Sequence, residues 1–264
     1  MAALKIDTHH HFVPTFLRQA MTDIPHLSKG MRTPTWTPQT TLSFMASNWI
    51  ETSILSCALP LAVLALEGPT KAATLTREVN DYLASLRTEH PTQLGFFASR
   101  LPSKTRKPAS RKSGTPSMTS TQMALESVWA VLNARGAVVF THPTIEGAAE
   151  NCIHEPFPIH PPPLDWTHET SRAATRLSGK WEEEFLEDAR RLYFDIALVG
   201  PPVTSLQLVR EFAWSGYVLF GTEFPFVAAE GAARRWEGAT VDGGENFMTE
   251  TRNAAQVLFP RLRG

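Results

Sequence analysis

The chain has little of what would tie it to a membrane, to nucleic acid or to a disulfide framework. Only two cysteines occur, Cys57 and Cys152, and they form no CxxC pattern, which argues against a cysteine zinc site and a disulfide scaffold. No run reaches the ~18 apolar residues of a membrane span, and no apolar signal segment opens the sequence. The formal net charge is −1, which gives no reason to expect a nucleic-acid partner. We therefore expect a cytoplasmic protein that binds neither membrane nor nucleic acid.

Strand-like and helix-like segments alternate along the 264 residues. A strand is predicted within 4–14, and short apolar runs predict further strands at 52–59, 94–98, 137–141, 193–198 and 217–221. Helices are predicted at 40–48, 69–90, 125–135, 182–192, 202–213 and 245–258. This alternation predicts an α/β protein with parallel strands and a single domain, 1–264. Six strands, where a (β/α)8 barrel needs eight, predict a distorted or incomplete TIM barrel.

One segment lacks the side chains that a buried strand needs. Residues 103–122 are basic, contain no acidic residue and have almost no aliphatic side chains. Such a segment cannot bury enough apolar surface to offset the entropy lost on ordering. Because no aromatic residue is interleaved, a solvated linker is favoured over a nucleic-acid patch. We expect 103–122 to be an irregular, exposed basic insert.

Three consecutive histidines end the first predicted strand, shortly before Pro14 closes it. Strand alternation places Asp7, His9 and His11 on one face and His10 on the other. Two imidazoles two residues apart on one face can bind a single cation, whereas a surface cluster or tag remnant would not be embedded in an apolar strand. We predict a metal site with His9 and His11, with Asp7 as a further ligand or an orienting carboxylate. His10 should face away and be dispensable for metal binding.

The stretch 7–11 resembles the Asp-x-His-x-His opening of the amidohydrolase superfamily. Further stretches resemble, in the same order, its decarboxylase branch, which includes aminocarboxymuconate semialdehyde decarboxylase and the resorcylate decarboxylases, and most of all the fungal 6-methylsalicylate decarboxylases. They are 5–14, 95–99, 135–144, 165–170, 193–195, 218–226 and 258–262. The resemblance implies a barrel enzyme of secondary metabolism that removes CO2 from a small aromatic carboxylic acid. It also implies a divalent metal, zinc first and manganese second.

The resemblance implies the remaining site residues as well. His142, followed by Pro143, matches the third protein ligand of the metal. Glu223 stands where relatives have an aspartate that binds the metal and takes part in proton transfer, so Glu223 is expected to be both ligand and catalytic group. The extra methylene of glutamate changes its reach by roughly 1.5 Å. The expected metal ligands are His9, His11, His142 and Glu223.

The resemblance also implies barrel units that this chain lacks. Relatives have a helix and the fourth strand near 103–122, and a sixth strand with a catalytic histidine where this chain passes from Thr170 to Glu182. Without that histidine we expect little or no turnover from the chain as written. Strand edges left exposed at the gaps should drive association with further copies of the chain, so a homo-oligomer is expected.

Three functions stay open at this point. The first is metal-dependent decarboxylation of an aromatic acid, most like 6-methylsalicylate. The second is hydrolysis of an amide or lactone by a metal-bound hydroxide, which would add water instead of releasing CO2. The third is an inactive barrel that serves as an oligomer partner, which the missing units and the glutamate at position 223 favour.

Overall fold

A computed structural model describes residues 4–22, 33–57, 68–99, 129–140, 142, 182–197, 203–227 and 246–263. The first half contains β1 (Lys5–Phe12), α1 (Thr15–Thr22), α2 (Pro38–Ser47), β2 (Ile50–Cys57), α4 (Pro69–Glu89) and β3 (Leu94–Phe96). The second half contains α8 (Glu182–Ala189), β4 (Phe194–Asp195), α9 (Val203–Phe212), β5 (Val218–Leu219), α11 (Phe247–Leu258) and η1 (Pro260–Leu262). The expected insert at 103–122 and the expected gap between Thr170 and Glu182 lie outside the described residues.

The strands run parallel and form one continuous layer. β1 pairs with β2 and β2 with β3, while β4 pairs with β5. Backbone hydrogen bonds join the two sheets, because Thr8 N donates to Phe220 O at 2.9 Å and Glu223 N donates to His9 O at 3.0 Å. The order is therefore β3-β2-β1-β5-β4, with β1 at the centre. Since all strands point the same way, their carboxyl ends meet along one edge of the layer.

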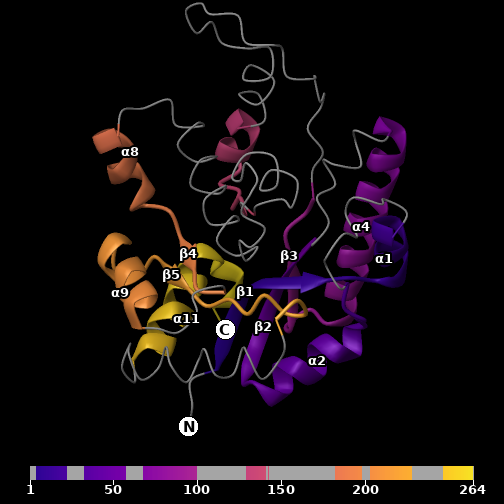
Figure 1. Cartoon of the computed structure of the whole chain (residues 1–264), viewed down its shortest axis with the longest axis horizontal. Coiled ribbons are helices and arrows are strands. Elements are labelled where there is room, and N and C mark those ends of the chain that lie inside the picture. Colours follow the sequence, from indigo (N-terminus) through magenta and orange to yellow (C-terminus); the bar gives the residue numbers. More distant parts are fainter. Residues whose placement is uncertain are drawn as a thin grey trace, which may run out of the picture.

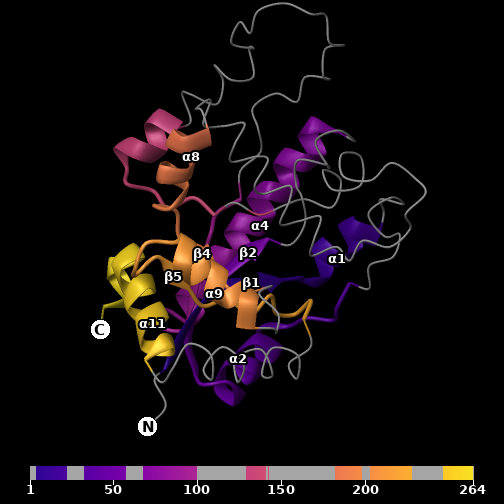
Figure 2. The ribbon, with the colours of Figure 1, turned by 60° about the vertical axis from the view of Figure 1, so that its left-hand side comes forward.

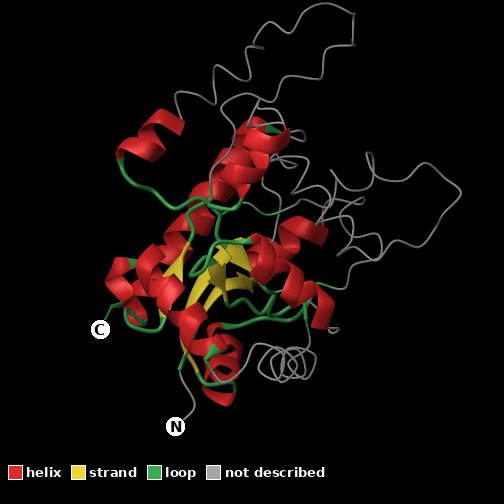
Figure 3. Ribbon diagram, turned by 90° about the vertical axis from the view of Figure 1, so that its left-hand side faces the viewer, coloured by secondary structure: helices red, strands yellow, loops and turns green. Residues whose placement is uncertain are grey.

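Helices surround this layer, which lies in the interior of the molecule (Figure 3). α4 buries the face marked by Ala72, Val79, Leu83 and Leu86, whose spacing is that of one side of a helix. In Figures 1 and 2, α2 lies below β2, and α11 lies beside β5 on the opposite flank. No helix in the described part of the chain is long and apolar enough to cross a membrane.

Two clusters of buried hydrophobic residues form the core of the described structure. The larger cluster joins β1 and β2 to α2 and α4 and includes Phe12, Trp36, Met45, Leu55 and Val79. The smaller one joins Ile6 and Leu219 to Ala254 and Ala255 of α11. β1 is buried along nearly its whole length, including its polar residues. Buried polar side chains are costly unless each finds a partner, so residues 7–11 must be paired within the protein.

One predicted strand is wrong. Residues 137–140 carry the expected apolar pattern, but they form no strand, and Val139 is 44% exposed. The preceding helix is present at 129–134 and ends at Gly136, whose φ is +55°, as the sequence predicted. A strand forms only where a neighbour completes its backbone hydrogen bonds. Among the described residues, 137–140 pair with no strand, and five strands and no closed barrel are found there.

Candidate metal centre

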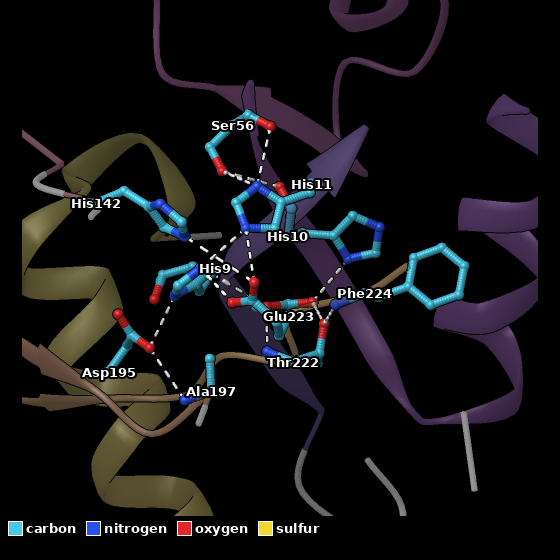
Figure 4. Close-up of polar contacts among 12 residues, drawn as sticks. His9, His10, His11, Ser56, His142, Asp195, Ala197, Thr222, Glu223 and Phe224 are labelled. Atoms are coloured by element: carbon cyan, nitrogen blue, oxygen red, sulfur yellow. Dashed lines mark hydrogen bonds and ion pairs between the residues drawn. The ribbon is translucent and has the colours of Figure 1, made fainter. Parts of the chain in front are cut away.

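The site lies at the carboxyl edge of the strand layer, where β1 brings His9 and His11 together (Figure 4). Their Nε2 atoms are 3.1 Å apart. Glu223, which follows β5, reaches both rings: Oε2 lies 2.7 Å from His9 Nε2, and Oε1 lies 3.2 Å from His11 Nε2. All three side chains are almost fully buried.

His142 completes a group of four side chains, from three parts of the chain, that could hold a metal ion. It comes directly after the segment 137–140, and its Nε2 lies 4.0 Å from Glu223 Oε1. The ring centroid of His142 is 5.1 Å from that of His9 and 4.9 Å from that of His11. His142 is a quarter exposed, so it forms the open side of the site.

Groups behind the two rings of β1 fix which nitrogen faces the centre. His9 Nδ1 lies 3.0 Å from Asp195 Oδ1, and His11 Nδ1 lies 3.0 Å from Ser56 Oγ. The Ser56 hydroxyl donates its own hydrogen to His10 O, so it accepts from His11 Nδ1. We therefore assign the proton of each neutral ring to Nδ1, which leaves both Nε2 lone pairs directed at Glu223.

These four side chains fit a divalent cation. One donor atom from each lies within 4.8 Å of the others. Ligand atoms of a tetrahedral site with bonds of ~2.0–2.1 Å are about 3.4 Å apart, close to the separations found here. Two Nε2 lone pairs facing each other at 3.1 Å repel unless a proton or a cation lies between them. Buried Glu223 Oε2 also has no hydrogen bond of good geometry in the described structure, despite its short distance to His9.

The charges of the site couple strongly in the absence of a cation. Burial favours neutral His9, but the carboxylates of Asp195 and Glu223 outweigh it and raise the pKa of the His9 imidazole well above its usual value. Burial likewise disfavours ionised Glu223, yet His11 and His9 hold the pKa of its carboxyl far below the usual range. The carboxylate is thus ionised and ready to bind a positive charge.

The backbone at Glu223 is held in an unusual conformation. Its φ is +60°, in the left-handed region that non-glycine residues seldom adopt. Just before it, Gly221 passes so close to β1 that a Cβ there would lie 2.7 Å from His9 Cβ and 3.0 Å from Ala197 Cβ. Residue 221 must therefore be glycine for Glu223 to approach His9.

The expected position of Asp7 is wrong. Its two carboxylate oxygens accept four hydrogen bonds, from His9 N, Thr222 N, Thr222 Oγ1 and His10 Nδ1. No lone pair remains for a cation, and Asp7 lies with His10 instead of with His9 and His11. The cause is a shift in the pairing register of β1 and β2. Asp7 pairs with Ser53 and His10 with Leu55, so β1 has one residue more than β2 over this stretch. The extra residue reverses the alternation of side chains between the two faces of β1. These contacts favour the second of the two expected roles, an orienting carboxylate, which stays a prediction.

Sequence reasoning missed Asp195. Asp195 ends β4, so its place at the carboxyl end of a predicted strand was a signal that could have found it. Phe12 and Trp36 are buried in the core. Phe226 does lie at the site, with its ring 5.5 Å from that of His11.

Comparison with known proteins decides the family. No protein-family model matches the chain. Decarboxylase macB of Penicillium terrestre is 32% identical over an alignment that covers 98% of this chain and 96% of the relative. The 6-methylsalicylic acid decarboxylase of Penicillium expansum is also 32% identical, with 98% of this chain and 97% of the relative covered.

The chain belongs to the fungal 6-methylsalicylic acid decarboxylase family. Solved structures share the fold, and several of them are decarboxylases of aromatic acids. One is the dihydroxybenzoic acid decarboxylase of Polaromonas sp. JS666, solved with bound manganese and the inhibitor 2-nitroresorcinol. It is 16% identical with a TM-score of 0.65, covering 100% of this chain and 98% of that one.

This member of the decarboxylase family is shorter than its relatives. The alignment with Decarboxylase macB spans 329 positions, and a chain of 264 residues leaves at least 65 of them without a counterpart. A loss of this size corresponds to more than one strand-and-helix unit of a barrel, each of ≈ 30 residues. The comparison agrees with the shortfall of strands counted from the sequence.

Proposed function

We propose that this chain is a metal-dependent decarboxylase of a small aromatic carboxylic acid, 6-methylsalicylate or a close analogue. The observation that carries the proposal is the convergence of His9, His11, His142 and Glu223 on one point, in a chain whose relatives are decarboxylases. The alternative of amide or lactone hydrolysis has no comparable support among those relatives. We further propose that the whole chain, 1–264, forms one incomplete TIM-type barrel with this site at its carboxyl edge.

We propose zinc or manganese as the metal. Imidazole nitrogen and carboxylate oxygen are ligands of both ions. Four protein ligands would complete the tetrahedron that zinc prefers, whereas a six-coordinate manganese ion would keep two positions for substrate oxygens. Manganese in the similar Polaromonas decarboxylase supports the second choice.

The chemistry of CO2 release assigns a task to Glu223. A bound divalent cation would orient the substrate carboxylate and withdraw electron density from the ring. Breaking the bond between ring and carboxylate leaves an electron pair on the ring carbon, which must take up a proton. The lowered pKa of Glu223 means that it is ionised before substrate arrives. It therefore has to receive the proton, from the substrate hydroxyl or from solvent, that it later gives to the ring carbon.

The test is CO2 release from 6-methylsalicylate by purified protein loaded with zinc or manganese. Turnover should be slow, because the catalytic histidine expected from relatives has no counterpart in this sequence. Loss of a general acid–base residue costs roughly 10²–10⁴-fold in rate. It should nevertheless exceed that of His9→Ala prepared in the same way, and a chelator should abolish it. Release that is equal in wild type and His9→Ala, or formation of a hydrolysis product from a lactone without any CO2, would contradict the proposal.

The expected homo-oligomer and the cytoplasmic location stay predictions. The first is supported by β3 and β4, which lie at the two ends of the described layer and have no further strand beside them among the described residues. The second has only the composition of the sequence behind it.

A further inference from the structure

A chain of buried hydrogen bonds leads from the metal centre into the core. Thr222 Oγ1 donates to Asp7 Oδ2 at 2.7 Å. Asp7 Oδ2 also lies 2.8 Å from His10 Nδ1. On the other side of the ring, His10 Nε2 lies 3.1 Å from Thr41 Oγ1. Thr41 Oγ1 accepts from Trp36 Nε1 at 2.8 Å. Only Trp36, at the outer end, is more than 2% exposed.

For a neutral His10 ring, the donors and acceptors of these hydrogen bonds allow one arrangement of hydrogens. The Trp36 indole can only donate, so the Thr41 hydroxyl accepts from it and gives its own hydrogen to His10 Nε2. His10 then carries its hydrogen on Nδ1 and donates it to Asp7. Asp7 receives hydrogens from both His10 and Thr222. Every polar atom of this hydrogen-bond chain is then satisfied.

The inner end of the chain fixes the backbone on both sides of Glu223. The Thr222 hydroxyl that donates to Asp7 also accepts from Phe224 N at 3.2 Å, and so spans residue 223. Phe224 O in turn accepts from His11 N at 2.7 Å. Between these anchors Glu223 has its φ of +60°. Such a conformation of a non-glycine residue persists only where the surrounding structure holds it.

We propose that Asp7, His10 and Thr222 are positioning residues that hold Glu223 in the geometry required of a metal ligand. His10 contributes no ligand atom, but its ring completes the acceptor set of Asp7 and so fixes the Thr222 hydroxyl. The sequence predicted that His10 is dispensable for metal binding. Under this proposal His10 is not a ligand, but it is needed to hold Glu223 in the correct position. The inference rests on the proposed metal site and is independent of which acid is the substrate.

The experiment is a titration of metal-free protein with Co²⁺, followed by the visible absorption of the bound ion, which reports coordination geometry. Thr222→Val keeps the shape of the side chain and removes the hydroxyl. It should bind Co²⁺ about 10-fold or more weakly, with an altered spectrum, because groups behind a ligand set its orientation. Thr222→Ser, which restores the hydroxyl, should recover both affinity and spectrum.

Two further variants keep the result decisive. Thr76→Val removes a buried hydroxyl that bonds only to Ala72 O within α4, so it controls for general destabilisation and should bind like wild type. Asp7→Asn replaces one carboxylate oxygen, which accepts hydrogen bonds, by an amide nitrogen, which can only donate to groups that are themselves donors. It should weaken Co²⁺ binding as Thr222→Val does. Wild-type affinity and spectrum in Thr222→Val would overturn the inference, as would equal weakening in Thr76→Val. Failure of wild type to bind Co²⁺ would instead overturn the metal site, and this inference with it.

Discussion

The imidazole of His9 depends on the carboxylate behind it. Asp195 accepts from Nδ1, which directs Nε2 to the centre and increases its basicity. Asp195→Ala should therefore weaken metal binding by about 10–100-fold while leaving the four ligands in place. Asp81→Ala, which removes an exposed acid on α4, is the matched control. Metal titration of the three proteins measures the effect, and equal affinities would show that Asp195 has no orienting role.

Protons and metal should compete for His9. Because Asp195 and Glu223 raise the pKa of this imidazole, metal-free protein keeps a proton there to a higher pH than an ordinary histidine would. A cation must displace that proton, so metal affinity should rise with pH and level off above the His9 pKa. Titrations across the neutral pH range, with the released protons counted, measure this directly. Affinity independent of pH would mean that His9 is already neutral or is no ligand.

Close approach of two segments brings Glu223 to β1. The Cβ of Gly221→Ala would meet both His9 and Ala197 at 3.0 Å or less, so β1, β4 and the segment after β5 would have to move apart. We expect a loss of about 1–3 kcal/mol in the free energy of unfolding, together with weaker metal binding. Denaturant unfolding measures the first. Gly68→Ala is the control, since its Cβ would meet nothing closer than 3.8 Å.

Regular elements could be predicted from the sequence because their signals are local. The helix predicted at 69–90 is α4 at Pro69–Glu89, and the strand predicted at 52–59 is β2 at Ile50–Cys57. The failures arose where distant segments decide the outcome. Residues 137–140 form no strand despite their apolar pattern, and an extra residue in β1 turns Asp7 away from His9. Periodicity within one segment carries no information about either.

The site could be predicted in part for the same reason. The stretch 7–11 and the resemblance of His142 and Glu223 to known ligands named four side chains that the structure brings together. Asp195 was missed because its partner, His9, lies 186 positions away in the sequence. Residues that hydrogen-bond to a metal ligand stand at no fixed sequence distance from it, so only the folded structure reveals them.

The molecule as a whole is a shortened member of its family, and this should affect its assembly. Strands left without neighbours offer backbone groups to other chains. We expect purified protein to self-associate or to have low solubility. Light scattering coupled to size-exclusion chromatography measures the mass in solution. A monomer that melts in one cooperative transition would contradict this expectation and show that the shortened layer is closed within one chain.

The metal centre is the central claim, and elemental analysis of purified protein tests it most directly. Wild type equilibrated with zinc or manganese should retain one ion per chain after removal of the excess. His9→Ala and His11→Ala should retain none, whereas His10→Ala, whose ring contacts Asp7 and Thr41 on the other face of β1, should still bind one ion when metal is saturating. Equal metal content in wild type and all three variants would contradict the account.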